Sequence, residues 1–185
     1  RKTPVSPPGS EEIERFNDAC TACHLCVSVC PTQVLQPAVS HYGLAYIMQP
    51  RMDYHAGYCN FDCTKCGEVC PTGAILKLTE KTKKRTQIGK VQFVQDNCIV
   101  ETEGTDCGAC AERCPIKAVY MVAYGQLFLP ETNEDICIGC GACEYSCPTQ
   151  PYKAIYVEGS PVHVQADKPK EEKIIEEDSD EEFPF

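Results

Sequence analysis

The alternation of apolar and polar positions predicts several short strands and few helices. Each candidate strand is brief and alternates imperfectly, and glycine or proline bounds several of them. Residues 123–125 and 159–161 lie between neighbouring candidates and have the composition of hairpin connections. The candidate strands are residues 44–48, 74–78, 90–95, 118–122, 126–129, 154–158 and 162–165.

The N-terminal segment follows a different pattern. Residues 1–10 contain three prolines, which favour an extended lead-in. Ser10 is suited to cap a helix, and Ile13 and Phe16 would share one face of that helix. The pattern therefore predicts a short helix that runs into Cys20.

Composition limits what this chain can be. Its 185 residues include 16 cysteines, six phenylalanines and no tryptophan, so the apolar core must be small and bound metal is expected to supply much of the folding free energy. No stretch approaches the ~18 consecutive apolar residues of a membrane span, so no transmembrane segment is predicted. The net charge of −10 argues against nucleic acid as a partner. The chain starts at Arg1 rather than Met, as expected of a processed or trimmed protein.

All sixteen cysteines fall into four runs of four, and each run ends in Cys-Pro. This is the ligand spacing of bacterial-type ferredoxins repeated four times, and it predicts four [4Fe-4S] clusters ligated by the sixteen thiolates. The runs are Cys20, Cys23, Cys26, Cys30; Cys59, Cys63, Cys66, Cys70; Cys98, Cys107, Cys110, Cys114; and Cys137, Cys140, Cys143, Cys147.

Disulfides and zinc are the two alternatives for these cysteines. An even number of cysteines suits a disulfide framework, but nothing in such a framework requires the same spacing four times. Structural zinc sites use separated pairs of cysteines, whereas three of the runs place three cysteines close together and a fourth after three more residues. Iron–sulfur clusters are therefore favoured, and a zinc-stapled interaction module is the remote alternative.

The grouping of three cysteines and then one has a structural meaning. A tight loop can supply thiolates to three corners of a cubane, and in two-cluster ferredoxins the fourth comes from the other run. We expect an α+β fold of two pseudo-symmetric ferredoxin-like units, with short strands and helices around the clusters. The predicted divisions are a lead-in and helix at 1–19, the cluster domain at 20–165 and an acidic tail at 166–185. Linker lengths leave open whether runs pair sequentially or in a nested order.

The chain resembles the MauM/NapG family of ferredoxin-type proteins from about residue 7 to residue 165. The cysteine runs alone would fit many polyferredoxins, whereas the Pro-Pro-Gly lead-in and a Tyr-Cys-Asn-Phe-Asp-Cys phrase are more specific. The matching stretches are residues 7–9, 50–54, 57–63, 107–115 and 137–143.

This resemblance implies an accessory electron-transfer subunit with four [4Fe-4S] clusters. It implies a place on the periplasmic face of the cytoplasmic membrane, between a quinol-oxidising membrane partner and a reductase or dehydrogenase; a cytoplasmic location is the alternative. Analogy with four-cluster subunits of molybdenum oxidoreductases favours nested pairing, in which Cys147 completes the set of Cys20, Cys23 and Cys26.

Other motifs change the picture little. No nucleophile–base pair or phosphate loop is present, so a non-catalytic carrier or an integral electron-wire subunit of a larger oxidoreductase is expected.

The basic run 81–85 is interpreted as a solvated loop tip, with docking of an acidic partner as the alternative. The gap 99–106 is interpreted as an inserted surface loop, with a partner-facing loop as its alternative. His24 and His55 are not expected to ligate iron, because no ligand is missing.

Overall fold

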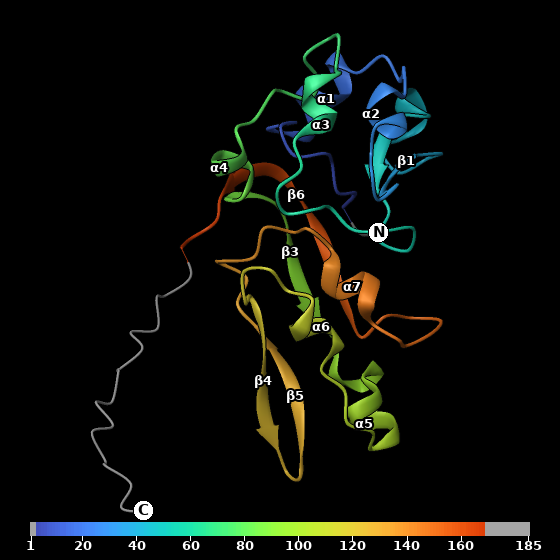
Figure 1. Cartoon of the computed structure of the whole chain (residues 1–185). Helices are drawn as coiled ribbons and strands as arrows, with labels where there is room; N and C mark the ends of the chain where they lie inside the picture. The colour runs from blue at the N-terminus through green and yellow to red at the C-terminus, as the bar shows by residue number, and fades with distance from the viewer. Residues whose placement is uncertain (1–2, 169–185) are drawn as a thin grey trace, which may run out of the picture.

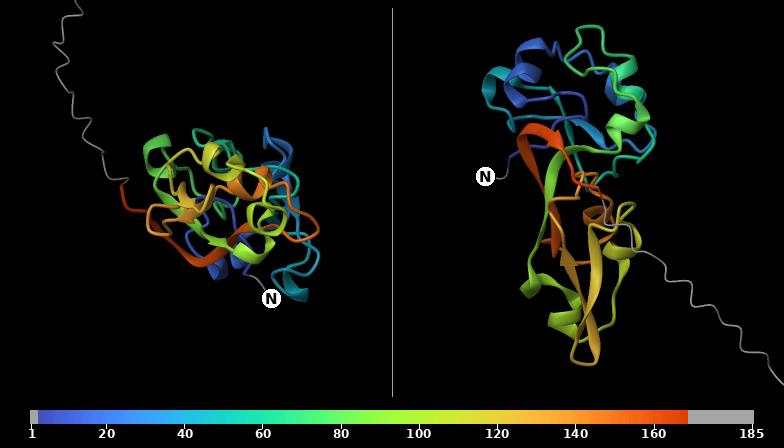
Figure 2. Two further views of the ribbon diagram at one scale, coloured as in Figure 1. Left: turned by 90° about the horizontal axis from the view of Figure 1, so that it is seen from below. Right: turned by 90° about the vertical axis from the view of Figure 1, so that its left-hand side faces the viewer.

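The computed structural model describes residues 3–168. It is a small α+β structure that is longer than it is wide, as Figure 1 and the right-hand view of Figure 2 show. The helices are α1 (Ile13–Ala19), α2 (Leu25–Ser28), α3 (Lys65–Glu68), α4 (Glu80–Lys83), α5 (Ile99–Glu103), α6 (Ala109–Glu112) and α7 (Ala142–Ser146), with 3₁₀ turns η1 (Leu44–Tyr46) and η2 (Gln95–Asn97). The strands are β1 (Leu35–Pro37), β2 (Pro50–Met52), β3 (Thr86–Phe93), β4 (Val119–Tyr124), β5 (Leu127–Thr132) and β6 (Ile155–Gln165).

The described strands form three antiparallel pairs, β1–β2, β3–β6 and β4–β5. The first half of the chain, with β1–β2, lies at one end, and β4–β5 lies at the other (Figure 1). The β3–β6 ribbon runs between the two ends and contributes to both apolar cores. Ile88 and Val157 belong to the core of the first half, whereas Val91 and Ile155 belong to that of the second. This ribbon therefore joins the two halves of the molecule.

The β4–β5 hairpin and the α1 helix confirm two predictions. β4 and β5 pair in register from Val119 opposite Thr132 to Tyr124 opposite Leu127, and Gly125 at the turn has a φ of 61°. α1 ends at Ala19, directly before Cys20, as expected. Its N-cap position is Glu12 rather than Ser10, whose hydroxyl instead donates to the carbonyl of Pro7 at 2.7 Å.

Two strand predictions and one prediction of a hairpin connection are wrong. Residues 44–48 contain the 3₁₀ turn η1, and residues 74–78 form no strand, although the N–H of Leu76 donates to the carbonyl of Gly9 at 2.9 Å. Residues 159–161 form no hairpin connection, because β6 continues through them.

Gly159 is needed for a close approach rather than for a turn. The lead-in crosses β6 at this point, where the N–H of Gly159 donates to the carbonyl of Thr3, and a Cβ on Gly159 would lie 2.2 Å from the carbonyl oxygen of Pro4. Residues 3–7 of the lead-in belong to no helix or strand, residues 8–9 form a turn, and residues 5–10 are buried. It is therefore an integral part of the fold.

His163 on β6 faces the lead-in. Its Nε2 lies 3.0 Å from the hydroxyl of the fully buried Ser6, and its buried Nδ1 has no hydrogen-bond partner. Burial lowers the pKa of His163 from 6.5 to about 4. Protonation of the ring would place a charge in a site that offers Nδ1 no acceptor, so the folded protein resists it.

This environment predicts a loss of stability in acid. Because the folded pKa of about 4 lies below the unfolded value of 6.5, the contribution is complete above pH 6.5 and is lost as pH falls toward 4. At pH 5 the loss should be about 2 kcal/mol, and His163→Gln should remove it. Denaturant unfolding of both proteins at pH 7 and pH 5 measures the difference. Parallel losses in the two proteins would contradict this assignment, because acid damage elsewhere affects both equally.

Among the described residues, no helix has both the length and the apolar character needed to cross a membrane.

Candidate iron–sulfur sites

The sixteen cysteines lie in four groups of four. Each group takes three cysteines from one run and the last cysteine of the neighbouring run, and three of the groups each line a small cavity. The fourth group is recognised by the mutual effects of its thiols on the pKa of Cys143. The groups are site A (Cys20, Cys23, Cys26, Cys70), site B (Cys30, Cys59, Cys63, Cys66), site C (Cys114, Cys137, Cys140, Cys143) and site D (Cys98, Cys107, Cys110, Cys147).

Nested pairing is therefore wrong. Cys70 rather than Cys147 joins Cys20, Cys23 and Cys26, and Cys147 lines the cavity of site D. The cause is helix packing, since α2 of the first run packs against α3 of the second and α6 of the third packs against α7 of the fourth. Each packed pair of helices brings the ends of two neighbouring runs together, which is the sequential arrangement.

The four sites follow one another in the order A, B, C, D. Burial is the main cause of the raised pKa of Cys66 in site B, and Cys26 of site A is among the thiols that raise it further. Burial is likewise the main cause of the raised pKa of Cys140 in site C, and Cys59 of site B adds to that rise. The N–H of Cys59 donates to the carbonyl of Cys140 at 2.9 Å. Sites C and D are also neighbours. Burial is the main cause of the raised pKa of Cys143 in site C, and Cys110 of site D is among the thiols that raise it further.

Burial suppresses ionisation of many of these thiols. It raises the pKa of Cys26, Cys110 and Cys140 to about 12 each, and neighbouring thiolates add to the rise. Such thiols keep their protons at neutral pH unless a positive group displaces them. Within residues 3–168, no three His, Cys, Asp or Glu side chains lie close enough together to bind a single metal ion. The thiols of one site therefore surround a shared space rather than one ion position.

The last cysteines of the second and fourth runs have a lowered pKa rather than a raised one. Burial acts to raise the pKa of Cys70 and Cys147, but hydrogen bonds outweigh it and lower both values. The N–H of Ile75 donates to Cys70 Sγ at 3.4 Å, and Thr149 Oγ1 lies 3.0 Å from Cys147 Sγ. These hydrogen bonds favour the thiolate form of the two sulfurs.

A threonine accompanies three of the four last cysteines. Thr32 and Thr72 each place Oγ1 3.7 Å from the sulfur two residues earlier, and Thr149 does so at 3.0 Å. In the third run Ile116 occupies the equivalent position, so Cys114 of site C receives no hydroxyl there. The recurrence of Cys-Pro-Thr was visible in the sequence, although its role was not predicted.

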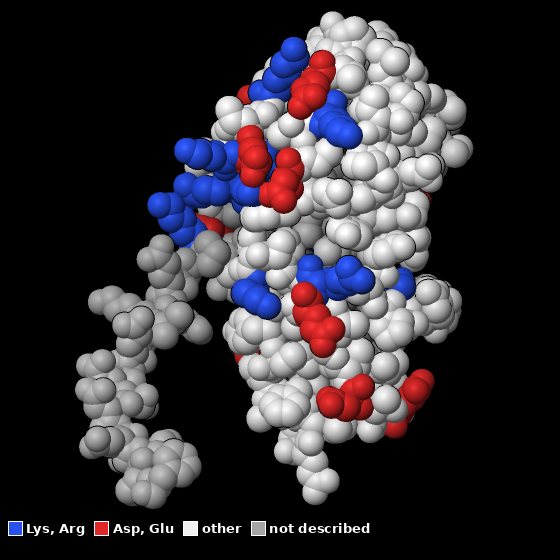
Figure 3. All heavy atoms as spheres, viewed as in Figure 1, with Lys and Arg blue, Asp and Glu red and all other residues white. Residues whose placement is uncertain are grey.

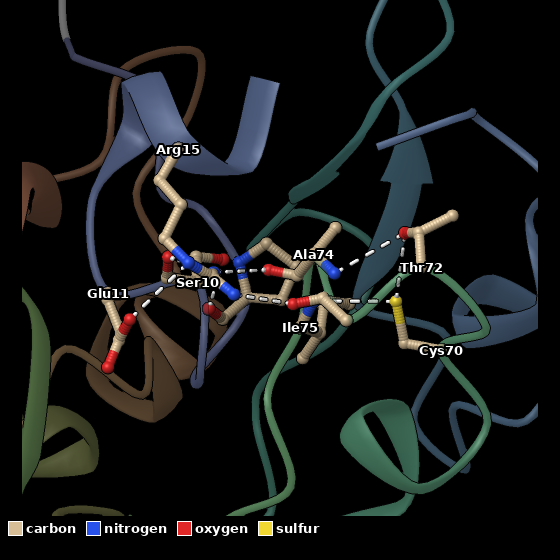
Figure 4. A network of polar contacts seen from close by, with 9 residues as sticks. Ser10, Glu11, Arg15, Cys70, Thr72, Ala74 and Ile75 are labelled. Atoms are coloured by element: carbon tan, nitrogen blue, oxygen red, sulfur yellow. Dashed lines mark hydrogen bonds and ion pairs between the residues drawn. The ribbon is translucent and has the colours of Figure 1, made fainter. Parts of the chain in front are cut away.

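Arg15 fixes the segment that follows Cys70, as Figure 4 shows. Its guanidinium donates to the carbonyl of Gly73 at 2.7 Å and to that of Ala74 at 3.2 Å, and it pairs with Glu11 at 3.4 Å. The same segment supplies the N–H that donates to Cys70 Sγ. Arg15 on α1 therefore orients a ligand of site A from a distant part of the sequence, and no sequence pattern indicated this role.

The basic run 81–85 is not a solvated loop tip, and that interpretation is wrong. Lys83 at the end of α4 is only 3 % exposed, and its ammonium donates to the carbonyls of Asn60 and Phe61, the latter at 3.1 Å. Lys84 faces outward and pairs with Asp62 and Glu80 at 2.5 Å each. Figure 3 shows basic and acidic side chains close together at this edge of the molecule.

A long stretch of the sequence, located at one end of the molecule, contains no charged side chain. Residues 19–50 contain no Lys, Arg, Asp or Glu, and the region around α2 and β1 is free of charged side chains in the view of Figure 3. Cys23 of site A is exposed here. Large apolar side chains are also exposed, including Leu44 at 82 %. The charge-free stretch was visible in the sequence, and it contains three of the four cysteines of site A.

The remaining candidates lie near the sites without joining a set of ligands. His24 lines the cavity of site A, where its Nε2 lies 2.7 Å from the carbonyl oxygen of Met48. His55 is exposed. The gap 99–106 contains the helix α5, in which Glu101 accepts a hydrogen bond from Gln95 at 3.0 Å. The acidic segment 169–185 lies outside the described residues.

The comparisons with known proteins agree with this arrangement. The family model for the 4Fe-4S dicluster domain matches residues 19–74 and 105–151, which are one match in each half of the chain.

Three groups of curated proteins are similar over most of this chain. Ferredoxin-type protein NapF of Escherichia coli is 25% identical over 83% of this chain and 85% of its own length. Methylamine utilization ferredoxin-type protein MauM of Methylorubrum extorquens is 30% identical over 77% of this chain and 67% of its own. Ferredoxin-type protein NapG of Escherichia coli is 29% identical over 77% and 65%.

Proposed function

Because the chain belongs to the 4Fe-4S dicluster family, we propose that it conducts electrons through four [4Fe-4S] clusters held at sites A, B, C and D. The observation that carries this proposal is the grouping of all sixteen cysteines into four sets of four, in one linear order. The clusters supply one-electron redox chemistry when bound. The chain itself supplies thiolates, hydrogen bonds to sulfur and burial, which set the reduction potentials.

The residues at the sites suit this group. The donors are all thiols, backbone N–H groups point at Cys70, Cys114 and Cys137, and Lys83 places a buried cation beside site B. A tetrahedral zinc ion with Zn–S bonds of about 2.3 Å would draw four sulfurs to about 3.8 Å from one another. Thiols that line a shared cavity suit a larger core better.

The linear order gives the protein two redox ends, at sites A and D. The charge-free region beside site A supports an end that docks on an uncharged protein surface, because burying a partner's charges there would leave them unpaired. Exposed apolar side chains such as Leu25 and Ile47 support a subunit of a larger oxidoreductase more than a freely diffusing carrier.

The partners follow from the family resemblance. The electron path joins a quinol-oxidising membrane protein to a reductase or dehydrogenase, at the periplasmic face of the cytoplasmic membrane. The similarity to the ferredoxin-type proteins NapG and MauM supports this assignment. A fractionation that finds the protein in the cytoplasm alone would contradict the location and leave the electron path intact.

The test of the function is the content of iron and sulfide. Anaerobically purified protein should contain about 16 iron and about 16 acid-labile sulfide per chain, since four clusters carry four of each. Reduction by dithionite should generate the EPR signals of [4Fe-4S]¹⁺ clusters. Stoichiometric zinc without sulfide would overturn the proposal in favour of a zinc-stapled module, and about half of this iron would reduce the number of clusters to two.

A further inference from the structure

Lys83 is a buried ammonium group without a carboxylate partner. Its residue is 3 % exposed, and none of the ion pairs within residues 3–168 involves it. A buried charge is costly unless an opposite charge compensates it. The charge of Lys83 is only the last of several causes that lower the pKa of Asp62, so most of the compensating negative charge must come from another group.

The contacts of Lys83 identify that group. Its Nζ donates to the carbonyls of Asn60 and Phe61, which lie between the ligands Cys59 and Cys63. Burial raises the pKa of Cys59, and the charge of Lys83 and a hydrogen bond from it oppose that rise. The ammonium thus sits inside the ligand loop of site B, where the negative charge is that of the thiolates and the cluster they would hold.

Short-range structure holds Lys83 in this place. The hydroxyl of Thr79 caps α4 by accepting from the N–H of Thr82 at 3.2 Å, and the N–H of Lys83 donates to the carbonyl of Thr79 at 2.9 Å. Lys84 grips the same loop from outside through Asp62 and lies over the ring of Phe61 at 5.0 Å. The loop of site B is therefore held by one buried lysine and one half-buried lysine.

We propose that Lys83 is a positioning residue that raises the reduction potential of the cluster at site B. The inference rests on the proposed function. A [4Fe-4S] core with four thiolates carries a net charge of about 2− when oxidised and 3− after it accepts one electron. Lys83 stabilises the more negative state more strongly, because the attraction grows with that charge. No bond forms or breaks and no proton moves, so the added electron is the only change.

The proposed role of Lys83 affects where electrons reside among the four sites, of which site B is the second. A raised potential at site B makes electrons reside there more readily than at an otherwise identical site without the cation. Exposed charges have less effect on a cluster, because solvent screens them. The buried Lys83 is therefore expected to raise the potential and the exposed Lys81 is not, although only one residue separates them in the sequence.

The experiment compares Lys83→Met with Lys81→Met in the purified, cluster-loaded chain. Each protein is titrated with dithionite while EPR follows the reduced clusters. Lys83→Met should reduce the reduced-to-oxidised ratio of one of the four clusters by about tenfold at fixed ambient potential, which is 59 mV for a one-electron couple. Lys81→Met should leave all four clusters at the wild-type values, because Lys81 is exposed and does not contact the loop of site B. Lys83→Arg should restore the shifted cluster.

Iron and sulfide content separates failure of this inference from failure of the function. A fully loaded Lys83→Met protein with unmoved midpoints would overturn the role of Lys83 and leave the clusters established. An equal shift in Lys81→Met would overturn it as well. If Lys83→Met loses iron, Lys83→Gln carries the test, because it retains a donor for the carbonyls without the charge. An unmoved midpoint in that loaded variant would overturn the proposal.

Discussion

Replacing Cys147 with serine is expected to disturb the cluster of Cys98, Cys107 and Cys110 and to leave that of Cys20, Cys23 and Cys26 intact. Cys147 lines the cavity of site D together with those three cysteines. Hydrogen bonds from Thr149 and from backbone N–H groups lower its pKa despite burial, so it is suited to bind iron as a thiolate. Loss of this ligand should remove or degrade one cluster of four, about a quarter of the iron.

Two further serine variants assign the change. Cys98→Ser should alter the same component of the Mössbauer and EPR spectra as Cys147→Ser, because both remove a ligand of site D. Cys20→Ser should alter a different component, that of site A. If Cys147→Ser and Cys20→Ser changed the same component, the sequential grouping would be refuted and nested pairing restored.

Replacing Gly141 with alanine is expected to destabilise the junction between sites B and C. Gly141 has a φ of +75°, and a Cβ there would lie 2.0 Å from a ring carbon of Tyr54. Tyr54 is buried, and its hydroxyl donates to the carbonyl of Gly139 in the ligand loop of site C. Its ring therefore cannot move away without losing that bond.

The expected cost of Gly141→Ala is about 2–5 kcal/mol, from overpacking together with left-handed backbone strain. This corresponds to a fall in apparent Tm of about 5–15 °C, measured by circular dichroism on the loaded protein. Gly104→Ala is the matched control, because Gly104 has a φ of +62° and its Cβ would meet nothing within 4 Å. The strain alone should cost about 1–2 kcal/mol. Equal falls in the two variants would show that Tyr54 does not constrain this loop.

The predictable parts of the fold were those specified by local pattern. The hairpin at Gly125 and the helix before Cys20 depend on neighbouring residues, and both are confirmed. Residues 159–161 have the composition of a turn, yet they lie within β6 because the lead-in crosses there. That contact joins residues far apart in the sequence, and no local pattern reports it.

The same division holds for the sites. The threonine after three of the Cys-Pro pairs and the charge-free stretch 19–50 could be read directly from the chain. Arg15, Tyr54 and Lys83 could not, because each acts on a ligand loop that is distant in sequence. A basic run is usually solvated, and here helix α4 turns Lys83 inward while Lys84 remains outside.

The sequence by itself determined the kind of chemistry, because the spacing within a run decides which sulfurs a short loop can present to one cubane. It also determined the family, since the spacing repeats across both halves of the chain. Only the tertiary structure decided which run supplies each fourth cysteine, the order of the sites and the burial of Lys83. These depend on the packing of α2 on α3 and of α6 on α7, and on the β3–β6 ribbon that joins the halves. Contacts between distant segments fix them, and the spacing within any one run is compatible with either pairing.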